Sequence, residues 1–269
     1  MPLQQLKTGR AVHINNVPGE ADGCPVLCIH GLGSSQNFYG AVIDELRRTR
    51  RCVAFDTPGS ARSPPPSAAQ SVKSISDDVV ALMDSLGLQK VILVGHSMGA
   101  IIASQTAVDH PTRVEKLILI GPVHPSEKAS EVFSQRIRTV RNGRDFISLL
   151  ILDGMEPLAN SIPASATGSR ASSLSRAFIR ELVLSQDPKG YISLCNVIAN
   201  ASSPEYAKIK CPTLIIAGEE DKSAPLDGCK FIQEGIGNAA KLEVLKGVGH
   251  WHCIESPNEV VYAISYFVE

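Results

Sequence analysis

The sequence shows no charge excess and no long apolar run. Its 26 Lys and Arg residues face 27 Asp and Glu residues, so the formal net charge is −1. A polyanion therefore has no chain-wide electrostatic reason to bind, and we expect no nucleic-acid partner. No stretch approaches the roughly 20 apolar residues that span a bilayer, and we expect neither a signal peptide nor a membrane partner.

The cysteines follow no regular spacing. There are seven, an odd number, at positions 24, 28, 52, 195, 211, 229 and 253. Several lie in or beside apolar runs, where a thiol acts as a small hydrophobe. This pattern favours a reducing compartment over a disulfide framework, so we expect a cytoplasmic protein. No obligate protein partner is evident from the sequence.

What the chain does contain is a series of short apolar runs that alternate with helix-like segments. Six runs rich in Val, Ile and Leu predict strands buried on both faces of a parallel sheet: 25–30, 52–56, 91–95, 116–121, 212–218 and 242–247. Apolar residues at three- and four-residue spacing predict helices over 37–48 and 75–88, and Ser256-Pro257 with Glu259 predicts a capped helix start. The fold class expected is α/β, with a mostly parallel central sheet flanked by helices.

The alternation stops between residues 122 and 205. Helical segments at 131–140 and 176–185 are joined there by a polar piece, 158–173, for which we predict a connector. We interpret 122–205 as a helical cap over the site, inserted between a first core part (1–121) and a second (206–269). Two interpretations of the cap arginines 136, 138, 141 and 144 stay open: attraction of an anionic substrate, or a solvated helix face.

A glycine-flanked serine follows the third of these runs. Gly95-His96-Ser97-Met98-Gly99 matches G-x-S-x-G, a strained strand-to-helix turn that raises a serine hydroxyl above a sheet. The turn is tight, so a Cβ at either glycine would collide with its neighbours. The following helix would direct its N-terminal N–H groups at Ser97, which favours negative charge there.

A reactive serine needs a histidine to remove its proton and an acid to orient that histidine. Glu219-Glu220-Asp221 follows one later run, and Gly249-His250 follows the next. The chain order Ser97, Asp221, His250 is the Ser…Asp…His order that accompanies a G-x-S-x-G turn. Glu127 is an alternative candidate for the acid. His250, His252 and Cys253 could instead hold zinc. No distant ligand pair with a familiar spacing completes such a site, so we expect no metal and no cofactor.

Two backbone N–H groups are expected to stabilise an oxyanion beside Ser97. One belongs to Met98, the residue after the serine, and the other to Leu32 in the glycine-rich loop 30–35. His30 and His96 are expected to shape their turns rather than transfer protons. Trp251 has two open interpretations, a pocket wall or a packing anchor.

These motifs together resemble the α/β-hydrolase superfamily. The matching stretches are HGLGSS (30–35), DTPGSARS (56–63), GHSMG (95–99), GEED (218–221) and GHWHCIESP (249–257). The resemblance selects Asp221 and His250 from their neighbours, and Ala61 stands where the family usually has a glycine. The compact cap is similar to that of 3-oxoadipate enol-lactonases and other small esterases.

The resemblance implies a cofactor-free serine hydrolase that cleaves a small carboxylic ester or lactone through an acyl-enzyme. Ser97, Asp221 and His250 would be catalytic, and the Leu32 and Met98 N–H groups would form the oxyanion hole. The alternatives are a small-lactone receptor of the same fold with slow turnover, and a carbon–carbon bond hydrolase.

Overall fold

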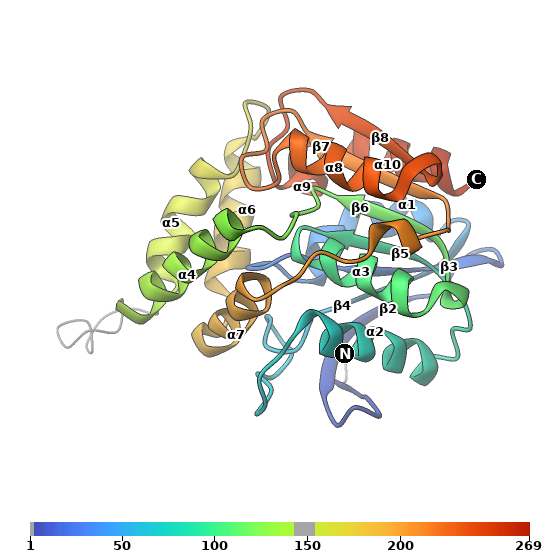
Figure 1. Cartoon of the computed structure of the whole chain (residues 1–269), viewed down its shortest axis with the longest axis horizontal. Helices are drawn as coiled ribbons and strands as arrows, with labels where there is room; N and C mark the ends of the chain where they lie inside the picture. The colour runs from blue at the N-terminus through green and yellow to red at the C-terminus, as the bar shows by residue number, and fades with distance from the viewer. Residues whose placement is uncertain (1–2, 143–153) are drawn as a thin grey trace.

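The computed structural model describes residues 3–142 and 154–269, and its centre is an eight-stranded sheet with helices on both faces (Figure 1). The strand order is β1-β2-β4-β3-β5-β6-β7-β8. β1 and β2 pair antiparallel, and the neighbouring strands from β4 to β8 pair parallel. The strands are β1 (Leu3–Gln5), β2 (Ala11–Val17), β3 (Gly23–Ile29), β4 (Arg50–Phe55), β5 (Val91–His96), β6 (Val114–Ile120), β7 (Thr213–Gly218) and β8 (Ala240–Leu245). The α/β fold class is confirmed.

All six predicted strands are present as β3 to β8, whereas β1 and β2 were not predicted. β5 is buried at every position, so its run of apolar residues is easy to recognise. β2 alternates less clearly, with His13, Asn15 and Asn16 among its seven residues. Its antiparallel place beside β4 comes from backbone pairing, which leaves little mark on the sequence.

Four core helices lie close to their predicted positions: α1 (Gly40–Leu46), α2 (Val72–Ser85), α3 (Met98–Asp109) and α10 (Pro257–Val268). Two more, α8 (Leu226–Ile236) and α9 (His252–Glu255), were not predicted. Residues 36–39 form a short 3-10 helix ahead of α1. α10 begins as predicted, with Ser256 at the N-cap and Pro257 in the first turn. The predicted capping box is wrong, because the Ser256 hydroxyl donates to the Glu259 carboxylate instead of accepting a backbone N–H bond.

Among the described residues between β6 and β7 are four more helices, gathered at one end of the molecule in Figure 1. They are α4 (Glu127–Asn142), α5 (Glu156–Ser165), α6 (Ser173–Leu184) and α7 (Pro188–Ala199). The connector predicted at 158–173 is wrong over its first half, which forms most of α5. The buried side chains of Leu158, Ala159 and Ile162 follow helical spacing and outweigh the polar composition. Arg144 lies outside the described residues.

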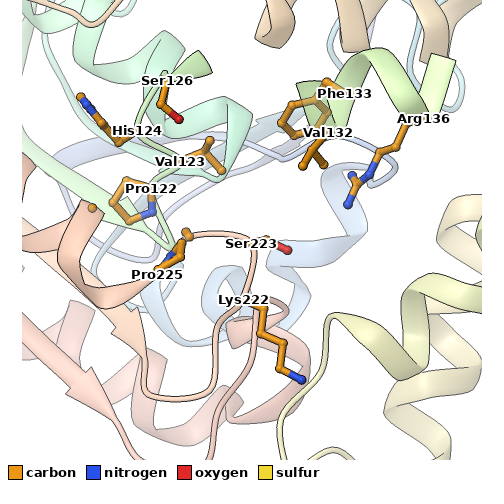
Figure 2. Close-up of a pocket in the computed structure, with 12 residues that line it drawn as sticks. Pro122, Val123, His124, Ser126, Val132, Phe133, Arg136, Lys222, Ser223 and Pro225 are labelled. Atoms are coloured by element: carbon orange, nitrogen blue, oxygen red, sulfur yellow. The ribbon is translucent and has the colours of Figure 1, made fainter. Parts of the chain in front are cut away.

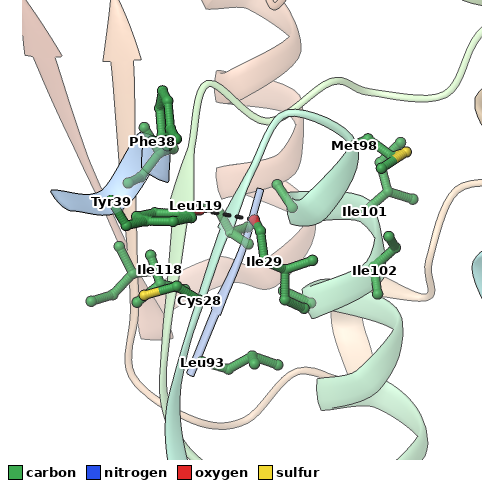
Figure 3. Close-up of a cluster of buried hydrophobic side chains, with 14 of the residues drawn as sticks. Cys28, Ile29, Phe38, Tyr39, Leu93, Met98, Ile101, Ile102, Ile118 and Leu119 are labelled. Carbon is green, nitrogen blue, oxygen red and sulfur yellow. Dashed lines mark hydrogen bonds between the residues drawn. The ribbon is translucent and has the colours of Figure 1, made fainter. Parts of the chain in front are cut away.

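Figure 3 shows the part of the core where α3 packs against the central strands. Met98, Ile101 and Ile102 of α3 are almost fully buried beside strand residues such as Ile29. The Tyr39 hydroxyl is also buried and donates to the Ile29 carbonyl at 2.8 Å. Each such apolar side chain contributes about 1.5–3 kcal/mol, so the turn between β5 and α3 stands on rigid packing.

All seven cysteines lie in the described ranges and carry free thiols. Burial raises the pKa of the Cys52 thiol to about 11 and that of Cys28 well above its usual value, so these groups stay neutral near pH 7. Within the described ranges, every helix is too short or too polar to cross a membrane.

Candidate active site

Ser97 stands alone between the last residue of β5 and the first residue of α3. Its φ of 54° lies in the left-handed region, which costs an ordinary residue roughly 1–2 kcal/mol. Glycines are required around it: a Cβ on Gly95 would lie 2.3 Å from the Gly99 carbonyl oxygen, and one on Gly99 would lie 2.1 Å from the Ile29 oxygen. The chain can therefore turn this sharply only with glycine at both positions.

The structure brings Ser97, His250 and Asp221 into one hydrogen-bonded chain. Ser97 Oγ lies 2.9 Å from His250 Nε2, and His250 Nδ1 lies 2.8 Å from Asp221 Oδ2. Because a carboxylate only accepts, Nδ1 carries the imidazole proton and Nε2 is left to accept from the serine hydroxyl. This is the tautomer that a general base needs.

Asp221 is held ionised although it is buried. Burial opposes its ionisation, but the pKa of the carboxyl is lowered by the adjacent His250, by the His250 hydrogen bond and by His252. Its second oxygen, Oδ1, accepts the N–H groups of Ser223 and Ala224 at 2.8 and 2.9 Å. Asp221 therefore presents a fixed negative charge to His250.

Two further histidines hold the backbone of His250. His96 Nε2 lies 2.8 Å and His252 Nδ1 lies 3.0 Å from the His250 carbonyl oxygen, so both rings donate to it. Burial lowers the pKa of His252 to about 4 and that of His96 well below its usual value, so both rings are neutral near pH 7. His96 also stacks on Phe38 at 4.1 Å between ring centroids. His96 therefore helps to shape the turn at Ser97, as expected, through contacts with Phe38 and with the His250 carbonyl that the sequence did not specify.

A buried carboxylate, Glu255, ties the His250 loop to the cap. Its Oε2 accepts the N–H groups of Gly168 at 2.7 Å and Gly249 at 2.9 Å, and its Oε1 accepts that of Trp251 at 2.8 Å. The His250 N–H donates across the same boundary to the Ala166 carbonyl at 2.8 Å. Sequence reasoning missed this role, although Glu255 lies within the matching stretch 249–257.

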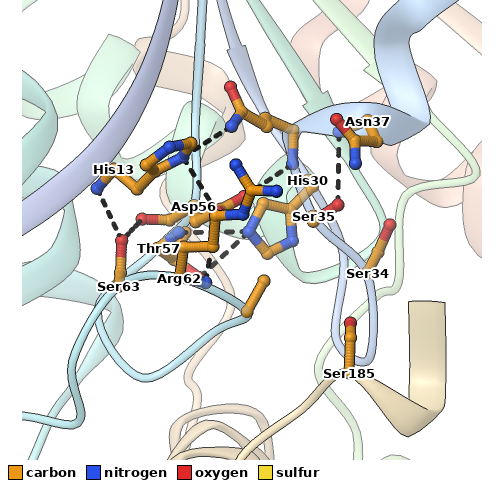
Figure 4. Close-up of polar contacts among 12 residues, drawn as sticks. His13, His30, Ser34, Ser35, Asn37, Asp56, Thr57, Arg62, Ser63 and Ser185 are labelled. Carbon is orange, nitrogen blue, oxygen red and sulfur yellow. Dashed lines mark hydrogen bonds and ion pairs between the residues drawn. The ribbon is translucent and has the colours of Figure 1, made fainter. Parts of the chain in front are cut away.

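The loop that carries Leu32 is held by polar contacts at the ends of β3 and β4 (Figure 4). Buried Asp56 accepts the Gln36 N–H at 2.8 Å. The Thr57 N–H donates to His30 Nε2 at 3.1 Å, so the His30 proton is on Nδ1, which donates to the Gly31 carbonyl at 2.7 Å. His30 thus shapes the turn, and its pKa is lowered by burial, which the nearby Asp56 opposes.

Ala61 lies in the loop that follows β4 and adopts the left-handed backbone conformation, with φ of 45°. This is the backbone geometry that the usual glycine would adopt without strain. The Ala61 N–H donates to Gln186 Oε1 at 3.2 Å, which links this loop to the segment between α6 and α7.

Leu32 and Met98 each keep an N–H group without an acceptor among the described residues. Leu32 lines the same small cavity as Ser97, and Met98 is the first residue of α3, where N–H groups have no intrahelical partner. These two N–H groups would be free to donate hydrogen bonds to an oxyanion formed at Ser97.

Two neighbouring cavities lie at this site, and Ser97 lines the smaller one. The first, of about 30 Å³, is lined by Ser97, His250, Leu32 and Trp251 among others. The second, of about 360 Å³, is lined mainly by apolar groups of the chain after β6, of α4 and of the Asp221 loop. Val123, Phe133, Arg136 and Ser223 line both, so the two cavities share a wall. The Trp251 side chain lines the smaller cavity and is also buried in the core, so both interpretations made from the sequence apply to it.

The alternative acid and the possible metal ligands named from the sequence do not form a site among the described residues. Glu127 begins α4 and is exposed, and the carboxylate hydrogen-bonded to His250 is that of Asp221. The described residues contain no group of three His, Cys, Asp or Glu side chains arranged to hold a metal ion. Of the described cap arginines, Arg136 lines the cavities, whereas Arg138 is exposed and donates to Gln135.

A family model described as alpha/beta hydrolase fold matches residues 25–257, and the chain belongs to this family. It is 27% identical over 277 aligned residues to a 2-hydroxymuconate semialdehyde hydrolase of Pseudomonas putida, covering 99% of this chain and 96% of that protein. A second relative, a putative carbamate hydrolase of Caulobacter sp., is 25% identical over 92% of this chain and 91% of that protein. Both of these relatives are named as hydrolases.

Solved structures support the same fold. An enol-lactonase from Burkholderia xenovorans LB400 superposes with a TM-score of 0.87 at 23% identity, covering 99% of each chain. A thermophilic esterase from Thermogutta terrifontis superposes with a TM-score of 0.86 at 22% identity, covering 100% of this chain and 98% of that one.

Proposed function

We propose that the protein is a serine hydrolase of small carboxylic esters or lactones. The observation that carries the proposal is the chain of contacts from Ser97 Oγ through His250 to Asp221, at 2.9 and 2.8 Å. A serine hydroxyl is a weak nucleophile without such a base, and a structural serine has no need of one.

The reaction would proceed in two steps. Ser97 Oγ attacks the carbonyl carbon while His250 Nε2 takes its proton, and the N–H groups of Leu32 and Met98 bind the developing oxyanion. His250 then gives its proton to the leaving oxygen, which departs and leaves an acyl-enzyme. Water, deprotonated by His250, releases the acid and restores Ser97. Asp221 keeps the imidazole oriented and stabilises its positive charge. No cofactor is needed for these steps.

Hydrolysis of 4-nitrophenyl acetate tests the proposal, with Ser97→Ala compared to wild type and Ser104→Ala as a control. Ser104 is a buried serine of α3 on the core side, so its loss leaves the site intact. We expect multiple turnover by wild type and by the control, and a loss of about 10³-fold or more in kcat for Ser97→Ala. Equal rates for Ser97→Ala and wild type would refute the proposal. Release of a single equivalent of nitrophenol per hour would favour a slow receptor.

A carbon–carbon bond hydrolase is the second candidate. It is favoured by the Pseudomonas putida relative, whose named substrate is neither an ester nor a lactone. Product analysis separates the two reactions, because ester cleavage releases an alcohol and an acid, whereas carbon–carbon cleavage of a ketone leaves a new C–H bond on one product.

A further inference from the structure

The cavity beside Ser97 is too small for a whole ester. Its volume of about 30 Å³ leaves room for only a few atoms. The neighbouring cavity of about 360 Å³ offers room for the remaining atoms of a substrate whose carbonyl lies at Ser97, past the residues that line both cavities. The side chains that line both cavities therefore contact whatever lies next to the scissile group.

Arg136 is the charged member of that shared wall. In Figure 2 its guanidinium extends from α4 towards the middle of the larger cavity, whereas the Lys222 side chain extends away from the other labelled residues. No Asp or Glu is among the described residues that line either cavity. The wall beside the scissile group thus carries positive charge only.

The groups next to the Arg136 guanidinium are neutral. It lies 5.1 Å from the Phe133 ring centroid, and it is close to the buried Tyr191 hydroxyl and Cys195 thiol. Burial raises the pKa of both groups well above 7, so neither supplies a negative charge. Within the described residues, no carboxylate forms an ion pair with Arg136, although other arginines such as Arg113 and Arg180 do have such partners.

A guanidinium at the wall of an apolar cavity, without an acid, is poorly compensated until an anion enters. Its planar fork of donors matches a carboxylate in two-point contact. We propose that the substrate carries a carboxylate on its acyl side, and that Arg136 binds this carboxylate while the carbonyl lies at Ser97. This inference rests on the proposed function and narrows its substrate class to anionic esters or lactones.

A matched pair of esters tests the inference. Mono-4-nitrophenyl pimelate and 4-nitrophenyl heptanoate have acyl chains of equal length, and only the first ends in a carboxylate. For Arg136→Gln we expect kcat/KM on the pimelate ester to fall about 10- to 100-fold, because one charge-assisted contact is lost. The fall on the heptanoate ester should be at least tenfold smaller. Arg136→Lys keeps the charge and should recover part of the loss.

Arg138→Gln is the matched control, since Arg138 lies two residues further along α4 and is exposed. It should leave the ratio of the two kcat/KM values as in wild type. Equal losses on both esters for Arg136→Gln, or no loss on either, would overturn the inference.

Failure of the proposed function is distinguishable from failure of this inference. If wild type hydrolyses neither ester, the proposed function is judged on 4-nitrophenyl acetate alone, and calorimetry of monomethyl against dimethyl pimelate decides the inference. Tighter binding of the monoanion, weakened at least tenfold in Arg136→Gln, supports it. Equal affinity of wild type and Arg136→Gln for the monoanion overturns it.

Discussion

Glu255→Gln should destabilise the fold and misplace His250, although the substitution changes only one atom. The Glu255 carboxylate accepts three N–H groups, two at Oε2 and one at Oε1. A glutamine can turn its oxygen towards Gly168 and Gly249, but its NH₂ group then faces the N–H of Trp251, donor against donor. The substitution thus removes one bond and leaves a buried N–H without an acceptor.

The magnitude follows from those three bonds. A hydrogen bond to a charged group contributes about 1.5–3 kcal/mol, and neutral acceptors form bonds about half as strong. With one bond lost and two weakened, we expect a loss of about 3 kcal/mol in the free energy of unfolding. The residues on both sides of His250 lose their anchor, so kcat on 4-nitrophenyl acetate should fall about 10- to 100-fold with little change in KM.

Urea denaturation followed by circular dichroism measures the first effect, and steady-state kinetics measures the second. Glu220→Gln is the control: Glu220 accepts the Ser169 N–H and hydroxyl at 2.8 and 2.7 Å, next to Gly168, but on the surface. It should keep the wild-type urea midpoint and kcat. If Glu255→Gln matched this control in both measurements, the positioning role of Glu255 would be refuted.

Three further predictions concern the turn, the acid and pH. Gly99→Ala should cost about 3 kcal/mol or more by urea denaturation because its Cβ meets the Ile29 carbonyl, whereas Gly40→Ala, with open space at its Cβ, should cost nothing; equal midpoints would contradict this. Asp221→Asn should lower kcat about 10³- to 10⁴-fold at pH 7 with KM little changed, and a loss below tenfold would argue against Asp221 as the orienting acid. The pKa of buried His252 is lowered to about 4 in the folded protein, whereas a histidine in the unfolded chain has a pKa of about 6.5. Between these two pH values the unfolded chain therefore binds a proton at His252 that the folded protein does not. Stability should therefore fall as the pH drops from 6.5 to 4, and His252→Asn should reduce that fall by up to about 3 kcal/mol; the same fall in both proteins would exclude His252 as its source.

Local patterns in the sequence were sufficient for the sheet from β3 to β8 and for the turn at Ser97. A short uninterrupted run of β-branched and aliphatic residues such as 91–94 is typical of a strand buried on both faces, and glycines at 95 and 99 allow the close crossing that follows. Parallel strands end at the same edge of the sheet, so the residues after β7 and β8 were expected near Ser97. That expectation used chain order and no distances.

Contacts between distant segments could be found only in the tertiary structure. The polar composition of 158–165 concealed α5, because burial against neighbouring helices, and not local preference, makes it helical. Arg136 and Arg138 look alike in the sequence, yet the direction of each side chain from α4 puts one in a cavity wall and the other in solvent. Glu255 gains its importance from N–H groups up to 87 residues away. Local backbone geometry is encoded by neighbours in the chain, whereas the surroundings of a charge depend on how the whole chain packs.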